Sequence, residues 1–205
     1  MTSEWLTRAL EESRARGFLG PGEISPHVTH ARGFIAAWRR HSPTPPSSFL
    51  DLGSGGGLPG LVLLDEWECR GLLLDSMAKR VAFLREVLTW PGSPRGGEVV
   101  LGRAEDLARR ADLESSVDLV TSRSFGPPSA TAECAARFLV VGGVLIVSEP
   151  PDAPARWDEA GLDRLGLRLG PREVPGATYQ LLIKERETPA QYPRRSGIPT
   201  KRPLF

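Results

Sequence analysis

The sequence has few cysteines, no long apolar run and almost no net charge, and each of these absences excludes a class of protein. Cys69 and Cys134 lie far apart without metal or redox spacing, so we expect two buried thiols in a reducing compartment. No apolar run reaches the ~18 residues that a membrane-spanning helix needs, and the N-terminus lacks the basic and apolar order of a signal peptide. We therefore expect a cytoplasmic protein that does not bind membranes.

A formal net charge of +1 gives no overall field that would attract nucleic acid. Positive charge is concentrated instead near the C-terminus. The 205 residues, 40% of them hydrophobic, suit one packed domain with small additions. We predict a helical N-terminal extension at 1–46, which ends in a proline-rich stretch, a main domain at 47–185 and a basic, proline-containing tail at 186–205.

Short apolar runs alternate with helical patterns along the main domain. This order is typical of a doubly wound α/β fold with a mostly parallel sheet. The expected strands cover 48–52, 71–75, 98–101, 117–121, 143–148, 166–173 and 179–183. The helices expected between them cover 59–67, 78–90, 104–110 and 127–138, after two N-terminal helices at 4–16 and 26–38.

The loop at 51–60, with the sequence DLGSGGGLPG, is the strongest functional signal. It follows the first expected strand, which is where open α/β sheets bind nucleotides. Four glycines, at 53, 55, 56 and 57, separate that strand from Pro59, which can open a helix. Because a simple turn needs only one or two glycines, four of them indicate a backbone that a ligand approaches closely.

The glycines alone fit two kinds of cofactor, because Gly55-x-Gly57-x-x-Gly60 also matches the dinucleotide fingerprint. Asp51 favours S-adenosylmethionine, since a carboxylate two residues before Gly53 can hold the methionine ammonium directly or through water. The same carboxylate would repel a pyrophosphate. We therefore predict S-adenosylmethionine as the cofactor, bound by Asp51, Gly53, Gly55 and Gly57.

Two further strand ends carry residues that suit a nucleoside. Asp75 ends the second strand at a distance along the chain that suits a bond to the ribose hydroxyls, and it can equally cap the next helix. The third strand leads to Ala104 and Glu105, whose backbone groups can read an adenine edge. An acidic residue in a first helical turn is the other explanation for Glu105, and the spacing leaves both open.

The fourth strand is followed by Ser122-Arg123-Ser124-Phe125, which we expect over the methyl end of the cofactor. Arg123 can bind the cofactor or a substrate phosphate, because a guanidinium binds anions in a fixed fork. Phe125 can stack on a nucleobase. A surface arginine and a core phenylalanine explain the same residues without a function, and the pattern does not decide between these interpretations.

Together, these motifs resemble the 16S ribosomal RNA guanine-N7 methyltransferase family, also called the glucose-inhibited division protein B family. The resemblance rests on the loop at 51–60, LLDSMAKRVAFLRE (73–86), GRAEDL (102–107), TSRSF (121–125) and YPRRSGIPTKRPL (192–204). It implies a seven-stranded class I S-adenosylmethionine-dependent methyltransferase fold and methylation of guanine N7 in 16S ribosomal RNA, with the small ribosomal subunit as partner. The cofactor contacts that it implies are Gly53, Leu58, Ala104, Glu105 and Arg123.

Two regions depart from the family pattern. The N-terminal extension does not reproduce the family's Asn-Leu-Thr and His-x-x-Asp-Ser motifs, and Glu149-Pro150 stands where the family has lysine-glycine. Loss of that positive charge should weaken contacts with RNA phosphates. A methyltransferase of the same fold that acts on another RNA or on a small molecule therefore stays open, and a dinucleotide-binding protein is a further alternative.

We predict neither a catalytic side chain nor a metal. Guanine N7 has a free lone pair, so transfer needs alignment and no base, and we expect His27, His30 and His41 to be solvated or structural. The tail has two interpretations, an arm that tracks RNA phosphates and a proline-stiffened strap along the domain. The expected substrate contacts are Arg123, Phe125, Arg194, Arg195, Lys201 and Arg202, and we expect a monomer.

Overall fold

The computed structural model describes residues 2–150, 156–173 and 177–205, which form a seven-stranded sheet with helices on both faces. The strands are β1 (Ser48–Leu52), β2 (Arg70–Asp75), β3 (Gly97–Leu101), β4 (Val117–Ser122), β5 (Leu139–Glu149), β6 (Leu167–Glu173) and β7 (Thr178–Lys184). Their order in the sheet is β3-β2-β1-β4-β5-β7-β6, with β1 to β5 parallel and β7 antiparallel to both neighbours. The predicted fold class is confirmed.

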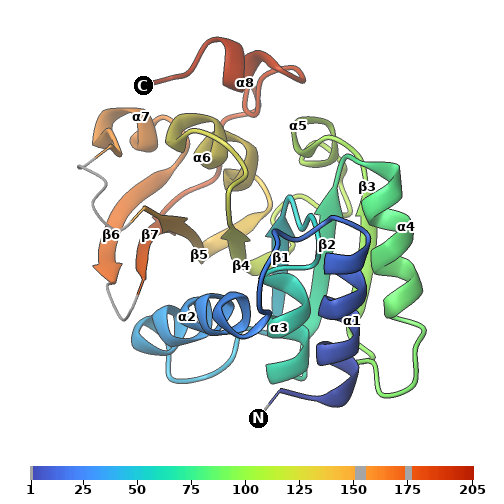
Figure 1. Ribbon diagram of the computed structural model, residues 1–205. Coiled ribbons are helices and arrows are strands. Elements are labelled where there is room, and N and C mark those ends of the chain that lie inside the picture. Colours follow the sequence, from blue (N-terminus) through green and yellow to red (C-terminus); the bar gives the residue numbers. More distant parts are fainter. Residues whose placement is uncertain (1, 151–155, 174–176) are drawn as a thin grey trace.

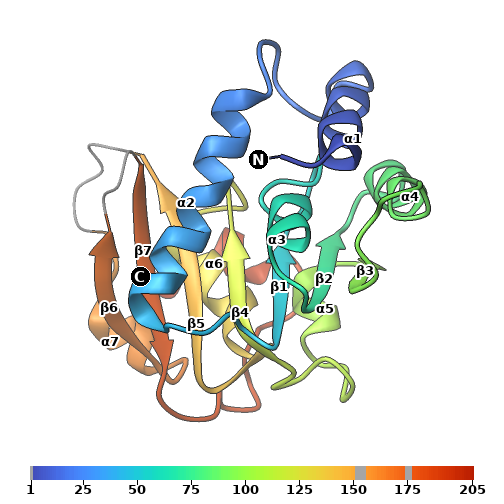
Figure 2. The same ribbon diagram turned by 90° about the horizontal axis from the view of Figure 1, so that it is seen from below.

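Alternating side chains of the strands form two separate cores, one on each face of the sheet. Phe49, Leu73 and Leu119 face one way, and Leu50, Leu72 and Val120 face the other, as expected for strands buried on both sides. Helices α1 (Glu4–Ala15), α2 (Ser25–His41), α3 (Gly60–Glu66) and α4 (Ala78–Val87) cover the first face. Helices α5 (Ala104–Leu107), α6 (Pro128–Ala136), α7 (Glu159–Asp163) and α8 (Ile198–Lys201) lie on the second face, as Figures 1 and 2 show.

The predicted elements match the structure closely, with differences at their ends. Strand β5 begins at Leu139, where the pattern predicts the end of a helix, because Gly142 and Gly143 interrupt its apolar character without ending the strand. The short helices α7 and α8 are missing from the prediction, since helices of one turn carry too little apolar periodicity to be recognised. Among the described residues, no helix has the length and apolar character needed to cross a membrane.

The N-terminal extension shares its core with the sheet. Helix α2 crosses the sheet so that Phe34 packs edge-on against Tyr179 of β7, with ring centroids 4.9 Å apart. The Tyr179 hydroxyl donates a hydrogen bond to the backbone carbonyl of His30. In helix α1, the indole N–H of Trp5 donates to the carbonyl of Val87 at 2.8 Å. Residues 4–41 are therefore part of the folded unit that carries the sheet.

This close packing predicts that α2 tolerates no side chain at Gly33. A Cβ atom there would lie 2.0 Å from the Tyr179 hydroxyl oxygen, so we expect Gly33→Ala to lower the free energy of unfolding by about 2 kcal/mol. Gly20→Ala is the matched control, because a Cβ at Gly20 meets nothing within 4 Å. Urea denaturation measures both changes. Equal stability of the two variants would show that α2 does not pack on β7 as described.

Candidate functional site

The glycine loop between β1 and α3 folds around backbone bonds to the neighbouring strand. The N–H groups of Gly53 and Ser54 both donate to the carbonyl of Leu74 at 2.9 Å. Gly53, Gly55 and Gly57 have φ angles of +75°, +54° and +101°, a region that favours glycine. The conformation of the turn thus requires three of the four glycines. The sequence had indicated only that the glycines let a ligand approach the backbone.

A cavity of about 460 Å³ opens above the carboxyl ends of β1 to β4, within the range of small-molecule sites. It brings together residues that are far apart in the sequence and that were predicted to bind cofactor or substrate. These are Gly53, Asp75, Ala104, Glu105, Phe125 and Lys201. The other predicted cofactor residues, Asp51, Gly55, Gly57, Leu58 and Arg123, lie outside the described lining of this cavity. Leu58 is 5% exposed and packs in the core beneath α3.

Asp75 joins the end of β2 to the glycine loop. One carboxylate oxygen accepts a hydrogen bond from the Gly55 N–H at 2.8 Å, and the other accepts from the Met77 N–H at 2.8 Å. The second bond supports the turn before α4, but the N-cap residue of α4 is Met77 and no side chain caps it, so Asp75 is not the cap of this helix. Each oxygen retains lone pairs, and Asp75 lines the cavity, so the carboxylate can also accept bonds from two hydroxyl groups of a ribose.

Glu105 connects the cavity to the C-terminal tail. Its Oε1 atom accepts hydrogen bonds from the Gly197 N–H at 2.9 Å and from the Arg103 guanidinium at 3.2 Å. Burial raises the pKa of this carboxyl, but the bonds from Gly197 and Arg103 outweigh burial and lower the pKa overall. Glu105 is therefore an ionised, structurally fixed group, and its neighbour Ala104 lies on the same wall of the cavity.

Asp51 lies behind the glycine loop and is 1% exposed. Its carboxylate accepts hydrogen bonds from the Gly60 N–H at 3.0 Å and from the Thr121 hydroxyl at 3.1 Å, which ties the start of α3 to β4. Burial raises the pKa of Asp51 to about 6, although both hydrogen bonds oppose this shift. The predicted contact of Asp51 with the methionine ammonium stays a prediction.

Arg123 points toward helix α2 and two histidines. Its Nη2 atom lies 3.1 Å from Nδ1 of His27, and its Nη1 atom is buried without a hydrogen-bond partner among the described residues. Burial first, and then the charges of Arg123 and His27, lower the pKa of His30 to about 4. His27 and His30 thus lie close to the site, although the sequence had indicated that they are solvated or structural. Their spacing of three residues, which places both on one face of α2, is the signal that could have revealed this.

Glu149 does not make this edge of the sheet acidic, which corrects the expectation that positive charge is lost here. The carboxylate is 2% exposed and accepts hydrogen bonds from Arg156 at 3.0 Å and from the Trp157 indole at 2.8 Å. Arg172 lies 3.5 Å from its other oxygen. Two guanidinium groups among the described side chains therefore lie against this one carboxylate.

The tail is a strap held along the second face of the sheet. Arg194 pairs with Glu133 of α6, whose side chain is 0% exposed, through N–O distances of 2.6 and 2.9 Å. Arg109 donates to three tail carbonyls, and the Leu204 N–H donates to the Ser129 hydroxyl at 2.7 Å. Arg194 is therefore an anchor of the tail, and any RNA contact that it makes has to compete with this ion pair.

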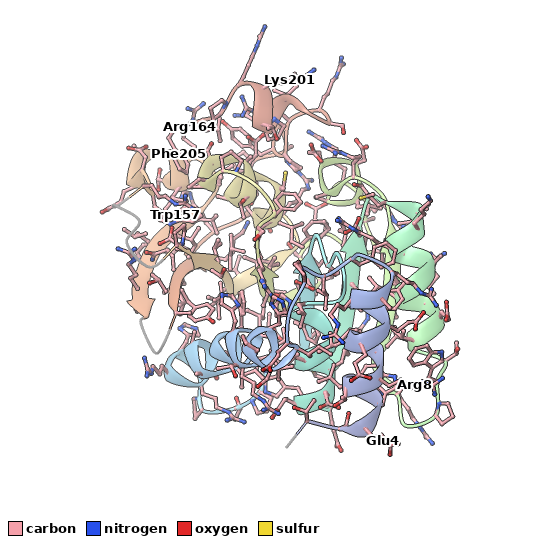
Figure 3. All side chains as sticks on the ribbon, in the orientation of Figure 1. Glu4, Arg8, Trp157, Arg164, Lys201 and Phe205 are labelled. Atoms are coloured by element: carbon pink, nitrogen blue, oxygen red, sulfur yellow. The ribbon has the colours of Figure 1, made fainter. Side chains whose placement is uncertain are left out.

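Three further basic side chains of the tail face outward. Arg195, Lys201 and Arg202 are exposed, and none of the ion pairs found among the described residues involves them. Figure 3 shows Lys201 at the outer end of the molecule and Phe205 near Arg164. Lys201 also lines the cavity. The strap and arm interpretations of the tail are thus compatible, because the same segment is anchored on one side and basic on the other.

Residues 27–149 match the model of the protein family described as rRNA small subunit methyltransferase G. Curated proteins named ribosomal RNA small subunit methyltransferase G are similar to most of the chain. The relative from Fervidobacterium nodosum is 34% identical over 76% of this chain and 76% of its own length. The relative from Moorella thermoacetica is 37% identical over 78% of this chain and 70% of its own length.

Solved structures share the fold at low sequence identity. A mutant of MtNAS in complex with S-adenosylmethionine has a TM-score of 0.61 at 15% identity, covering 89% of this chain and 73% of that chain. Cofactor-bound Rv0187 from MTB has a TM-score of 0.60 at 20% identity, covering 90% of this chain and 91% of that chain. At these identities, the likeness shows a common fold.

Proposed function

The chain belongs to the rRNA small subunit methyltransferase G family, and on this premise we propose that it transfers the methyl group of S-adenosylmethionine to N7 of a guanine in 16S ribosomal RNA. The observation that carries this proposal is the cavity at the ends of β1 to β4, which both Asp75 and Glu105 line. We expect the protein to act as a monomer in the cytoplasm, where small ribosomal subunits are assembled.

We place the adenosine of the cofactor in this cavity. Asp75 accepts bonds from the ribose hydroxyls, and the backbone at Ala104 and Glu105 reads the adenine edge. Gly53 lets the Phe125 ring pack against the loop, because a Cβ atom there would lie 2.8 Å from that ring. The methionine part extends from Gly53 toward Ser122 and Arg123, at the end of β4 and directly after it. Asp51, Gly55, Gly57 and Leu58 shape the loop from behind.

Methyl transfer to guanine N7 requires alignment and no proton removal. The N7 lone pair attacks the methyl carbon, the bond to sulfur breaks, and its electron pair stays on sulfur, so the positive charge moves from the sulfonium to the purine. Orientation of the two reactants supplies much of the rate in such a displacement. Neutral His30 adds no charge beside the purine as it becomes cationic, and the proposed mechanism uses no general base.

The tail supplies the sequence-independent part of RNA binding in this proposal. Arg195, Lys201 and Arg202 are exposed, and Lys201 lines the cavity, so these side chains can contact the phosphates that flank a target guanine. Arg156, which pairs with Glu149 at the end of β5, adds a further guanidinium group on this side.

Transfer of tritiated methyl from S-adenosylmethionine to undermethylated small subunits and to naked 16S RNA tests the proposed function. We expect incorporation into at least one of them, at a guanine that becomes sensitive to cleavage at N7. Thermal shifts with S-adenosylhomocysteine and with NAD are measured in parallel. If the protein binds S-adenosylhomocysteine but methylates neither RNA, the acceptor is a different molecule. Stabilisation by NAD alone would make the protein a dinucleotide-binding protein instead.

The anchored and the exposed basic side chains of the tail predict different effects on stability when they are replaced by alanine. We expect Arg194→Ala to lower the free energy of unfolding by about 3 kcal/mol, because it leaves the buried Glu133 carboxylate unpaired. The triple variant Arg195→Ala, Lys201→Ala and Arg202→Ala should keep its stability within ~0.5 kcal/mol. Its plot of log RNA affinity against log salt should become flatter by about 2. An unchanged salt slope in the triple variant would limit the tail to its structural role.

A further inference from the structure

A second cavity, of about 390 Å³, lies beside the first at the ends of β4 and β5. Ser122 and Arg123 form one side, and Glu149 with Arg156 forms the other. His30 of α2 also contributes to its lining. The two cavities share the loop Ser124, Phe125 and Gly126. A group bound in one cavity is therefore adjacent to a group bound in the other.

Three buried polar atoms without a hydrogen-bond partner belong to residues that line this second cavity. They are His30 Nδ1, Ser122 Oγ and Arg123 Nη1, out of five such atoms found among the described side chains. A buried polar atom without a partner costs about 1–3 kcal/mol, so most native structures satisfy such groups. Three of them around one cavity point to a polar ligand that supplies the missing partners.

The hydrogen-bonding capacity of the three atoms limits the kinds of ligand that the cavity can bind. The Arg123 Nη1 group can only donate a hydrogen bond, so it requires an acceptor. Neutral His30 can accept at Nδ1, and the Ser122 hydroxyl can donate or accept. A planar group that carries both acceptors and N–H donors on its edge matches this set. Guanine has such an edge, with O6 beside N7 and with the N1 and N2 donors next to O6, whereas adenine has an amino donor in place of O6.

The rim of the cavity suits the backbone of a nucleic acid. Arg156 lines the cavity and pairs with the buried Glu149 carboxylate, with N–O at 3.0 Å. The carboxylate fixes Arg156 through the bond to its Nε atom, which leaves the two terminal nitrogens of the guanidinium for an anion. A nucleotide with its base in the cavity would place its phosphate on this side.

We propose that the cavity formed by His30, Ser122 and Arg123 receives the target base, a guanine extruded from the RNA, with Arg123 donating to O6. This assignment rests on the proposed methyl transfer. His30 and Ser122 are specificity-determining contacts to the base edge, and the shared loop at 124–126 is where N7 meets the methyl group. Extrusion of a base into a pocket is how enzymes that modify nucleobases reach their target atom.

His30→Phe tests the proposal with the least change in packing. Phenylalanine keeps the ring contacts with Phe34 and Tyr179 but removes both nitrogens. His41→Phe is the matched control, because His41 is an exposed residue of the same helix. Ser122→Ala removes the second unpartnered atom independently. Calorimetry with S-adenosylhomocysteine and steady-state methyl transfer to undermethylated small subunits are measured for all four proteins.

We expect His30→Phe and Ser122→Ala to bind S-adenosylhomocysteine as the wild type does and to lose about tenfold or more in kcat/KM for RNA. The control should retain both values. Unchanged kcat/KM in both variants would overturn the proposal. A loss of S-adenosylhomocysteine affinity that matches the loss of activity would also overturn it, because the cavity would then belong to the cofactor.

Nucleotide binding separates this proposal from the proposed function. Saturation-transfer NMR on the protein saturated with S-adenosylhomocysteine should detect GMP in preference to AMP, and His30→Phe should weaken the GMP signal. If the wild type methylates no RNA but shows this His30-dependent preference, the base pocket stands and the ribosomal acceptor is wrong. If the wild type methylates RNA but shows no preference for GMP, the base pocket is wrong.

Discussion

The reversal of strand order at β1 creates a crevice at the carboxyl ends of the strands, and the rest of the structure depends on this crevice. The connections from β1 lead to β2 and β3 on one side, and β4 and β5 lie on the other. At such a reversal of strand order, the loops at the carboxyl ends separate and leave space for a ligand. A cavity lies on each half of this edge. One cavity lies over β1 to β4 and the second over β4 and β5, with the loop at 124–126 between them.

Buried ionic groups fix the walls of this crevice. Asp75 holds the glycine loop, Glu105 holds the tail at Gly197, and Glu149 holds Arg156. Each carboxylate is almost fully buried, so its desolvation is costly and its hydrogen bonds have to be well formed. The arrangement favours a preorganised site, in which ligand groups meet donors and acceptors that already have their positions.

The features of the structure that depend on local sequence patterns could be predicted. Alternation of apolar runs predicts the sheet, and the position of Asp75 at a strand end predicts its place beside the glycine loop. Contacts between distant segments could not be predicted in this way. The pair of Arg194 with Glu133 joins residues 61 positions apart, and the approach of α2 to β7 brings His30 beside Tyr179. Neither contact leaves a periodic signal, which is why Arg194 was predicted to contact RNA and His30 was expected to be solvated or structural.

The central claim is that the cavity over β1 to β4 holds the adenosine of S-adenosylmethionine through Asp75. Calorimetry with S-adenosylhomocysteine on the wild type, Asp75→Ala and Asp112→Ala tests it most directly, because Asp112 is an exposed carboxylate that does not line the cavity. Loss of charge-assisted bonds to the ribose predicts a Kd about 10- to 100-fold weaker for Asp75→Ala and an unchanged Kd for Asp112→Ala. Equal affinity in a folded Asp75→Ala variant would contradict the account.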